Sequence, residues 1–451
     1  MFCSVTSSPR NVLLSDLSVG SASLGSEDKA GSVRSCPRLG MKNPSHPGLS
    51  ATRTRATDVL HWPDADHKFS LVLGGPLYQL YLRTRLSTPR LGLVRRRALI
   101  IPLICWAPLL ILAAVAGQAM GRVSLPFLLD VEVHARFLVA VPLLIIAELL
   151  VHQRMVVVVR QFIERDMIAP DNRTRFDQII ASTMRMRNSM LVEVLLLVFC
   201  FTVAHWIWRE QFALTGATWY AVRSDGMMSL SRAGYWYAFV SLPIFRFLLF
   251  RWYFRIFLWY QFLWRVRRLP LQLNLFHPDH AAGLGFLAGS IPALSPVLLA
   301  QTTLISGTIA DRILHAGARL VDFRAEIAGA IVFLMLVPLA PLAFFAVQLE
   351  RAHRKARREF GILSSKYVDD FRDKWTRHKT DSTEPLLGTP DLQSLADLGN
   401  SFKTITEIGL FPFGKQALIR LLGVLILPFL PLILTVIPLK EIVSWVVKLA
   451  F

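Results

Sequence analysis

The sequence predicts an all-α fold, a polytopic transmembrane helical bundle of about seven spans with cytoplasmic helical extensions. Of its 451 residues, 53% are apolar and only 18% are charged, and the mean hydropathy is +0.45. This composition is too apolar for a water-soluble chain of this length. Seven apolar segments are long enough to cross a hydrocarbon core of ~30 Å as helices. They run approximately over residues 98–116, 135–151, 190–208, 234–264, 286–310, 327–348 and 417–439.

The region before the first span has two parts. Residues 1–65 are rich in Ser, Gly, Thr and Pro and hold no apolar stretch long enough for a signal sequence, which predicts a disordered tail. Met41 offers a later start within this tail. Residues 66–97 are expected to form an interfacial or cytoplasmic segment, in which Pro76 begins either a short interfacial helix or a simple loop.

Two segments are expected to extend beyond the membrane. One lies within the transmembrane region 98–348, and the other follows it. Residues 152–188 continue the second span and restart a helix at Pro170, which predicts a helical hairpin on the cytoplasmic side. Residues 349–416 form a cytoplasmic helical insert whose second helix begins at Pro390. The last region, 417–451, holds the seventh span and a closing stretch that lies in the interface or returns partway.

The distribution of basic residues predicts the orientation. The net charge of +19 comes from Lys and Arg that gather in alternate connections between the spans. Seven arginines fall within 152–188 and twelve basic residues within 349–416, whereas the connection after the first span holds only Arg122. The positive-inside rule therefore places the N-terminus in the cytoplasm. The same charges fit anionic phospholipids of the bilayer, so no nucleic-acid partner is expected.

A buried charge layer is predicted by three arginines inside the fourth span, Arg246, Arg251 and Arg255. Because a guanidinium near the bilayer centre costs at least ~2.5 kcal/mol, each should face protein or water and pair with an acid. Glu148 and Glu193 lie at a depth similar to Arg251 and Arg255, which share a helical face. These four are expected to form one ionic cluster, whereas Arg246 points elsewhere and has no evident acid.

The charge layer has two interpretations. As a functional site it would be a gate, a proton relay or an anion-handling site. As a structural clamp it would fix the packing of three spans, and this interpretation is favoured until water is seen there.

A second constellation precedes the fifth span, where His277, Asp279 and His280 form part of a tight turn. An anion or lipid headgroup site would use these residues together with Arg265, Arg267 and Arg268. A metal site is the weaker alternative, with His152 as a further ligand to His277 and His280. A structural turn that starts the next helix is the most favoured interpretation. The sequence assigns no catalytic residue, no metal and no cofactor.

Several strings resemble, as a set, a family of uncharacterised bacterial inner-membrane proteins. They are FSLVLGGPLYQL from Phe69, FLLDVEVHARFL from Phe127, FHPDHAAGLGFL from Phe276, EPLLGTPDLQSLADLGNSF from Glu384 and LPLILTVIPLKE from Leu430. The resemblance covers the chain from about residue 65 onward. It implies a multi-pass protein of the bacterial inner membrane and brings no established activity.

Three functions remain open from the sequence. The leading one is a transporter or channel-like permease built around the charge layer. The first alternative is a membrane scaffold or signalling protein that binds a cytoplasmic protein partner through 349–416. The second is an enzyme that modifies lipid headgroups at His277, Asp279 and His280, although an enzyme is the less favoured class. The sequence does not fix the oligomeric state.

Overall fold

The computed structural model describes residues 69–84, 93–121, 123–202, 206, 218–224, 227–377 and 388–434. They belong to one compact unit, Pro63–Phe451. Most of this part of the chain is helical, and its two strands, β1 (Ala221–Ser224) and β2 (Met227–Leu230), pair in one antiparallel hairpin. The predicted all-α helical bundle is confirmed. The predicted tail over 1–65 and the closing stretch 442–451 lie outside the described residues.

Six helical segments are long and apolar enough to cross a membrane, so the chain is a multi-pass membrane protein. Several of them join two labelled helices through a 3-10 or π-helical turn. The segments are Val94–Val115 (α2), Val131–Glu164 (α3, Val131–His134, and α4, Val141–Glu164), Arg232–Val266 (α8, Arg232–Trp236, and α9, Leu242–Val266), Leu284–Ala316 (ending in α10, Ser290–Ala316), Leu320–Ala343 (ending in α11, Arg324–Ala343) and Lys415–Ile433 (α14, Lys415–Ile426, and α15, Leu430–Ile433).

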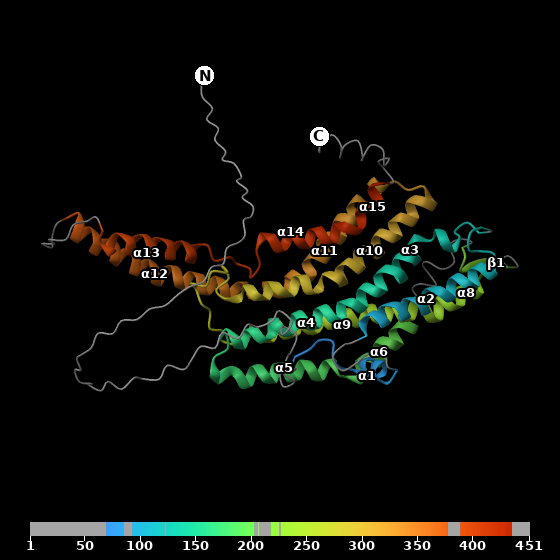
Figure 1. Ribbon diagram of the computed structural model, residues 1–451, viewed down its shortest axis with the longest axis horizontal. Helices are drawn as coiled ribbons and strands as arrows, with labels where there is room; N and C mark the ends of the chain where they lie inside the picture. The colour runs from blue at the N-terminus through green and yellow to red at the C-terminus, as the bar shows by residue number, and fades with distance from the viewer. Residues whose placement is uncertain are drawn as a thin grey trace, which may run out of the picture. The chain divides into compact units, whose positions relative to one another are not determined.

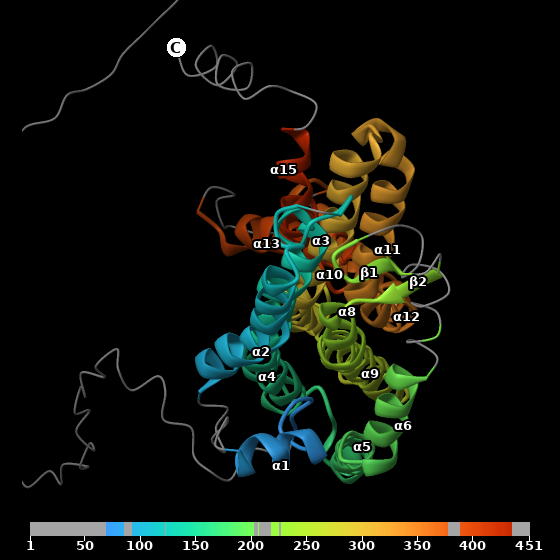
Figure 2. The same ribbon diagram turned by 90° about the vertical axis from the view of Figure 1, so that its right-hand side faces the viewer.

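The third predicted span, 190–208, is helical over α6 (Met190–Phe201), and residues 203–205, 207 and 208 are not described. Two β-bridges nevertheless mark the two ends of the bundle. Leu125 pairs with Thr218 beside the end of α2, and Ile168 pairs with Leu271 beyond the end of α9. The chain must therefore pass from one end to the other between residues 168 and 218. A broken helix, α5 (Arg173–Arg187) followed by α6, covers part of this passage beside α9 (Figure 2).

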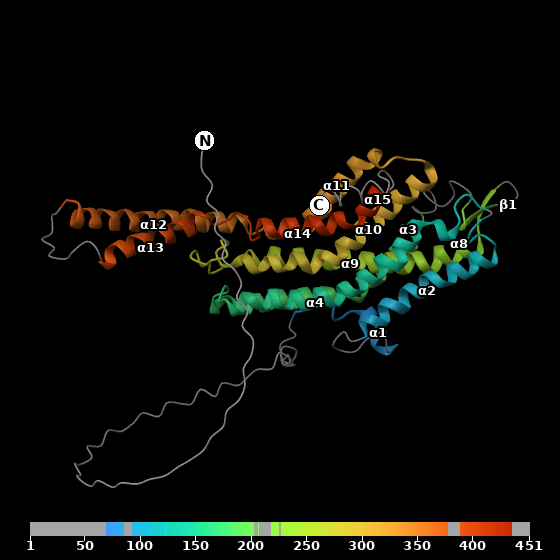
Figure 3. The same cartoon turned by 45° about the horizontal axis from the view of Figure 1, so that its top comes forward.

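Helices α4 and α10 form the centre of the bundle, and the other spans pack around them (Figures 1 and 3). α4 contacts α2, α9 and α10, while α10 also contacts α11 and α14. The segments that contain α4, α9 and α10 have 33 to 35 residues, more than the ~20 that a span requires, so they extend past the hydrocarbon core. The predicted extension 152–188 belongs to this region. It packs on α9 through Phe162, Phe176 and Phe262.

The segment before α2 differs from the predicted interfacial element. α1 (Pro76–Arg83) does begin at Pro76, but residues Phe69–Val72 are buried in the core. The ring of Phe69 packs against Trp259 and Phe262 of α9. An extended, apolar stretch thus enters the bundle because its side chains bury more favourably against the aromatic face of α9 than at a headgroup surface.

The predicted insert over 349–416 is an antiparallel hairpin of α12 (Ala346–Trp375) and α13 (Pro390–Thr406) (Figure 1). At its outer end the Asp391 carboxylate accepts hydrogen bonds from Lys374 Nζ at 2.8 Å and Trp375 Nε1 at 3.1 Å. Nearer the bundle the rings of Phe360 and Phe402 stack. Pro390 occupies the first turn of α13, as predicted.

Candidate functional site

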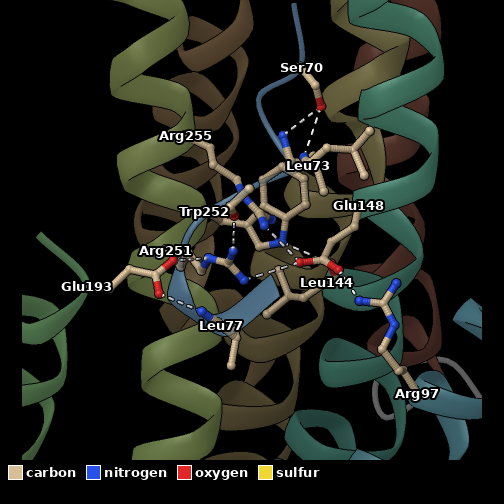
Figure 4. Close-up of polar contacts among 12 residues, drawn as sticks. Ser70, Leu73, Leu77, Arg97, Leu144, Glu148, Glu193, Arg251, Trp252 and Arg255 are labelled. Atoms are coloured by element: carbon tan, nitrogen blue, oxygen red, sulfur yellow. Dashed lines mark hydrogen bonds and ion pairs between the residues drawn. The ribbon is translucent and has the colours of Figure 1, made fainter. Parts of the chain in front are cut away.

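The structure brings four of the five predicted charge-layer residues into one buried cluster (Figure 4). Glu148 projects from α4, Glu193 from α6, and Arg251 and Arg255 from successive turns of α9. Arg255 Nη2 donates to Glu148 Oε1 at 2.9 Å. Arg251 lies between the two acids, with Nη1 3.8 Å from Glu148 Oε1 and Nε 3.3 Å from Glu193 Oε1. The cluster therefore ties three helices together.

Arg97 is a fifth member of this cluster. It lies in the first turn of α2, is 1% exposed, and its Nη1 donates to Glu148 Oε2 at 2.6 Å. Glu148 thus faces three guanidinium groups within 4 Å, a charge-assisted arrangement that offsets the cost of its burial. The sequence shows Arg97 only as the last of three consecutive arginines before a span. Arg97 faces inward because of the helical turn at which α2 enters the bundle. Hydropathy does not define that turn.

The extended segment Phe69–Gly75 closes the cluster on one side. Arg251 Nη2 donates to the carbonyl oxygen of Gly74 at 3.3 Å, and Leu77 N–H donates to Glu193 Oε2 at 2.8 Å. Gly75 has φ +88°, and a Cβ atom there would lie 2.5 Å from Glu193 Oε1. A side chain would therefore displace the carboxylate, and glycine is required for this close approach.

Two further residues hold the same segment at Ser70. Arg187, the last residue of α5, donates to the Ser70 carbonyl oxygen. His152 Nδ1 lies 2.9 Å from Ser70 Oγ. Among the described residues of this region, four guanidinium groups surround two carboxylates, so the site carries net positive charge.

Arg246 lies apart from the cluster, as the helical spacing predicted. It is half-buried, near Tyr237 and Arg136, and its Nη1 atom is buried without a hydrogen-bond partner among the residues described here. Arg136 in turn donates to Glu132 and to the hydroxyl of Tyr237. Arg246 and Arg136 therefore belong to a second polar region, nearer the β-hairpin end of the bundle.

The turn His277–His280 is organised by Asp279. One oxygen of its carboxylate accepts hydrogen bonds from the N–H groups of Ala281 and Gly283, at 2.9 and 3.0 Å, and the other from Gly285 at 2.9 Å. Burial alone would raise the pKa of Asp279, but these three N–H groups and His277 hold it below its usual value. The Asp279 carboxylate thus binds the N–H groups of the turn that leads into the segment Leu284–Ala316. This role matches the structural interpretation of the motif.

The other residues predicted around this turn do not gather there. Arg265 Nη1 donates to Ser182 Oγ at 2.7 Å, while Arg267 and Arg268 pack over the ring of Trp264. The arginine that lies beside Asp279 is instead Arg165, whose Nη1 is 3.9 Å from Asp279 Oδ2.

The metal hypothesis also lacks a common centre. His152 lies thirteen residues before Arg165, which directly follows α4, a separation of ~20 Å along the helix axis from the His277 turn. His277 Nδ1 contacts Asp279 Oδ1 at 3.1 Å, and His280 faces Glu407 at 3.8 Å. Within the described ranges, no group of three His, Cys, Asp or Glu side chains is arranged to hold a metal ion.

A pair of acids that the sequence did not single out lies at the opposite end of the bundle. Asp130 precedes α3, accepts a hydrogen bond from Val133 N–H, and accepts another from Trp219 Nε1, both at 2.8 Å. Asp311 of α10 accepts from the N–H groups of Val131 and Glu132. Both carboxylates thus satisfy the free N–H groups of one helix start. Asp130 could have been identified as an N-cap from the string DVEVH, but no local pattern predicts the partnership of Asp311.

No protein-family model, curated protein or solved structure matches this chain. The function proposed below therefore rests on the geometry of the buried cluster and on the membrane-spanning architecture.

Proposed function

We propose that this membrane protein is a transporter or channel-like permease, and that the segment Phe69–Gly75 is its gate, closed against the buried cluster around Glu148 and Arg251. The supporting observation is the burial of non-helical backbone beside charged groups between long apolar helices. Inside a membrane, irregular backbone is tolerated only where protein covers it or where it lines a water-filled cavity. In many transporters, non-helical backbone between the halves of a broken helix likewise lies at the binding site.

The contacts define what would have to move. The segment is held by the guanidinium groups of Arg187 and Arg251 and by the Glu193 carboxylate, while Glu148 is held independently by Arg97 and Arg255. Withdrawal of the segment would expose Arg251 and Glu193 and leave the Glu148 pairs in place. The gate is therefore the movable segment, and the Glu148 pairs are the fixed frame.

Reactivity of a buried position on the segment tests this proposal. In a chain whose four native cysteines are replaced by alanine, Val72→Cys should react with a membrane-impermeant thiol reagent in proteoliposomes, because gate opening exposes it to water. Ala300→Cys on α10 is the control, since both native side chains are at most 1% exposed. Equal protection of both cysteines in a folded protein would refute a water-accessible gate and leave the cluster as a packing clamp.

The α12–α13 hairpin supports a second candidate, a scaffold for a cytoplasmic protein. Two packed helices leave much of their surface uncovered, and Leu363 and Leu392 are 54% and 49% exposed. Exposed apolar groups on such an extension are typical of a docking surface. Leu363→Lys with Leu392→Lys should abolish retention of a partner while membrane insertion is unchanged. Normal retention by the double variant would contradict the scaffold.

The proposed location is the bacterial inner membrane with a cytoplasmic N-terminus. The connections at the end of the bundle that holds Arg165 and Arg265 carry most of the basic residues, which fits the positive-inside rule. On this orientation the α12–α13 hairpin is cytoplasmic, and anionic phospholipids face its basic first turns.

A further inference from the structure

An apolar groove runs along the outside of the bundle, between α11 and the helices at the end of the last described span. Its volume is about 450 Å³, within the range that holds a small ligand. One wall is formed by Ile327, Ala328 and Ile331 of α11, and the other by Phe429, Leu430 and Ile433.

Both walls belong to helices that qualify as membrane spans. The groove therefore opens toward hydrocarbon, where the available ligands are lipid chains. In a soluble protein such a surface would mark a protein interface. Here, a lipid acyl chain in the groove makes apolar contact along the concave surface. It fills the space that the two packed helices leave between them.

Among the described residues that line the groove, Arg324 alone is charged. It begins α11, one turn after the span starts at Leu320, and its side chain is exposed. No ion pair engages Arg324 within the described part of the chain; the neighbouring Arg319 is the residue that pairs with Asp322. A guanidinium this close to the end of a span can extend to the headgroup layer, where it matches a phosphate in charge and geometry.

We propose that this groove binds one membrane phospholipid, with an acyl chain between α11 and α15 and its phosphate paired with Arg324. The apolar walls bind the acyl chain, and the guanidinium group of Arg324 binds the phosphate. The site therefore distinguishes a phospholipid from an uncharged alkyl compound. None of the residues that line the groove belongs to the proposed gate, so the two sites are separate.

Native mass spectrometry of the full-length protein, titrated with phosphatidylglycerol in detergent, tests the assignment. Ala328→Trp should fill the groove and lose one bound phosphatidylglycerol relative to the unmodified protein. Gly329→Trp is the matched control, because position 329 faces open space and does not line the groove. Arg324→Gln should keep the lipid but weaken its binding about five-fold, the effect of one basic residue near a membrane surface.

A second filling variant, Ile433→Trp, approaches from the opposite wall and covers the case in which Ala328→Trp fails to fold. If both folded filling variants retain as many lipids as Gly329→Trp, the proposal is overturned. The same result is expected if the chain's own residues 435–451 occupy the groove, so that outcome also overturns it. Unchanged binding in Arg324→Gln would overturn the phosphate assignment.

Discussion

Glu148 shows how one buried acid can fix several helices. Its two oxygens contact guanidinium groups from α2 and α9, while its own backbone belongs to α4. A buried ion pair contributes little net stability compared with an apolar core, but removal of one partner leaves the other charges buried and unpaired. Substitution of Glu148 is therefore expected to reduce stability by much more than any single contact contributes to it.

Glu148→Gln should lower the free energy of unfolding by ~3 kcal/mol, because three arginines lose their shared counter-charge. Denaturant unfolding in micelles would measure the change. Glu164→Gln on the same helix is the control, since Glu164 pairs with Arg160 at an exposed position and such pairs contribute ~0.5 kcal/mol. Equal effects at the two positions would contradict the buried-cluster assignment.

Asp279→Asn should destabilise the turn by ~2 kcal/mol at neutral pH, because an amide cannot replace a carboxylate that accepts three N–H groups. The pKa of Asp279 is held below its usual value in the folded protein, so its stabilising effect is complete above pH ~4 and is lost as the pH falls below that. Unfolding measured from pH 7 to pH 3 should show the two proteins converging only at the acid end. The control is Asp166→Asn, which should change stability little because the Asp166 side chain is 80% exposed. A stability difference between the Asp279→Asn variant and the unmodified protein that disappears near pH 6 would contradict this account.

At the scale of elements, the extended segment Phe69–Gly75 departs most from its prediction. Hydropathy identifies spans because helices must satisfy their own backbone in lipid, and six predicted spans appear as helices for this reason. A short apolar run does not predict its own environment, because it is compatible with a buried segment, with an interfacial segment and with a loop. Its true environment depends on Arg187, Arg251 and Glu193, which are more than a hundred residues away in sequence.

Gly75→Ala should destabilise the protein by ~2 kcal/mol, because its Cβ would clash with Glu193 and the φ of +88° disfavours a side chain. Gly399→Ala on α13 should have the opposite sign, a gain of up to ~1 kcal/mol, since nothing lies near that position and alanine favours a helix. Unfolding midpoints of the two variants would provide the comparison. Unchanged or increased stability of Gly75→Ala would show that segment packing does not constrain Gly75.

At the scale of the whole molecule, the passage between residues 168 and 218 determines the topology. Counting this passage with the six apolar helices gives seven crossings, although α5 and α6 are separated by a break that hydropathy alone does not predict. The architecture was predictable because the bilayer imposes one length and one composition on every span. The pairing of Asp130 with Asp311 was not, because it depends on how two distant helices meet.

Seven crossings predict that the loop after α2 and the α12–α13 hairpin lie on opposite faces of the membrane. In proteoliposomes of uniform orientation, single cysteines at Met120 and Ile362, which are 80% and 66% exposed, should be labelled from different sides by an impermeant reagent. Asp171→Cys, before α5, should behave like Ile362→Cys. Labelling of Met120→Cys and Ile362→Cys from the same side would exclude this topology.

The base of the α12–α13 hairpin rests on the turn that starts Leu284–Ala316. Gly409 N–H donates to the His280 carbonyl oxygen at 2.7 Å, and Phe276 packs against Phe360 of α12. The hairpin is therefore attached to the turn that precedes the segment Leu284–Ala316. That segment contains α10, and α10 packs against α4, the helix that carries Glu148. A continuous series of contacts therefore joins the α12–α13 hairpin to the buried cluster around Glu148.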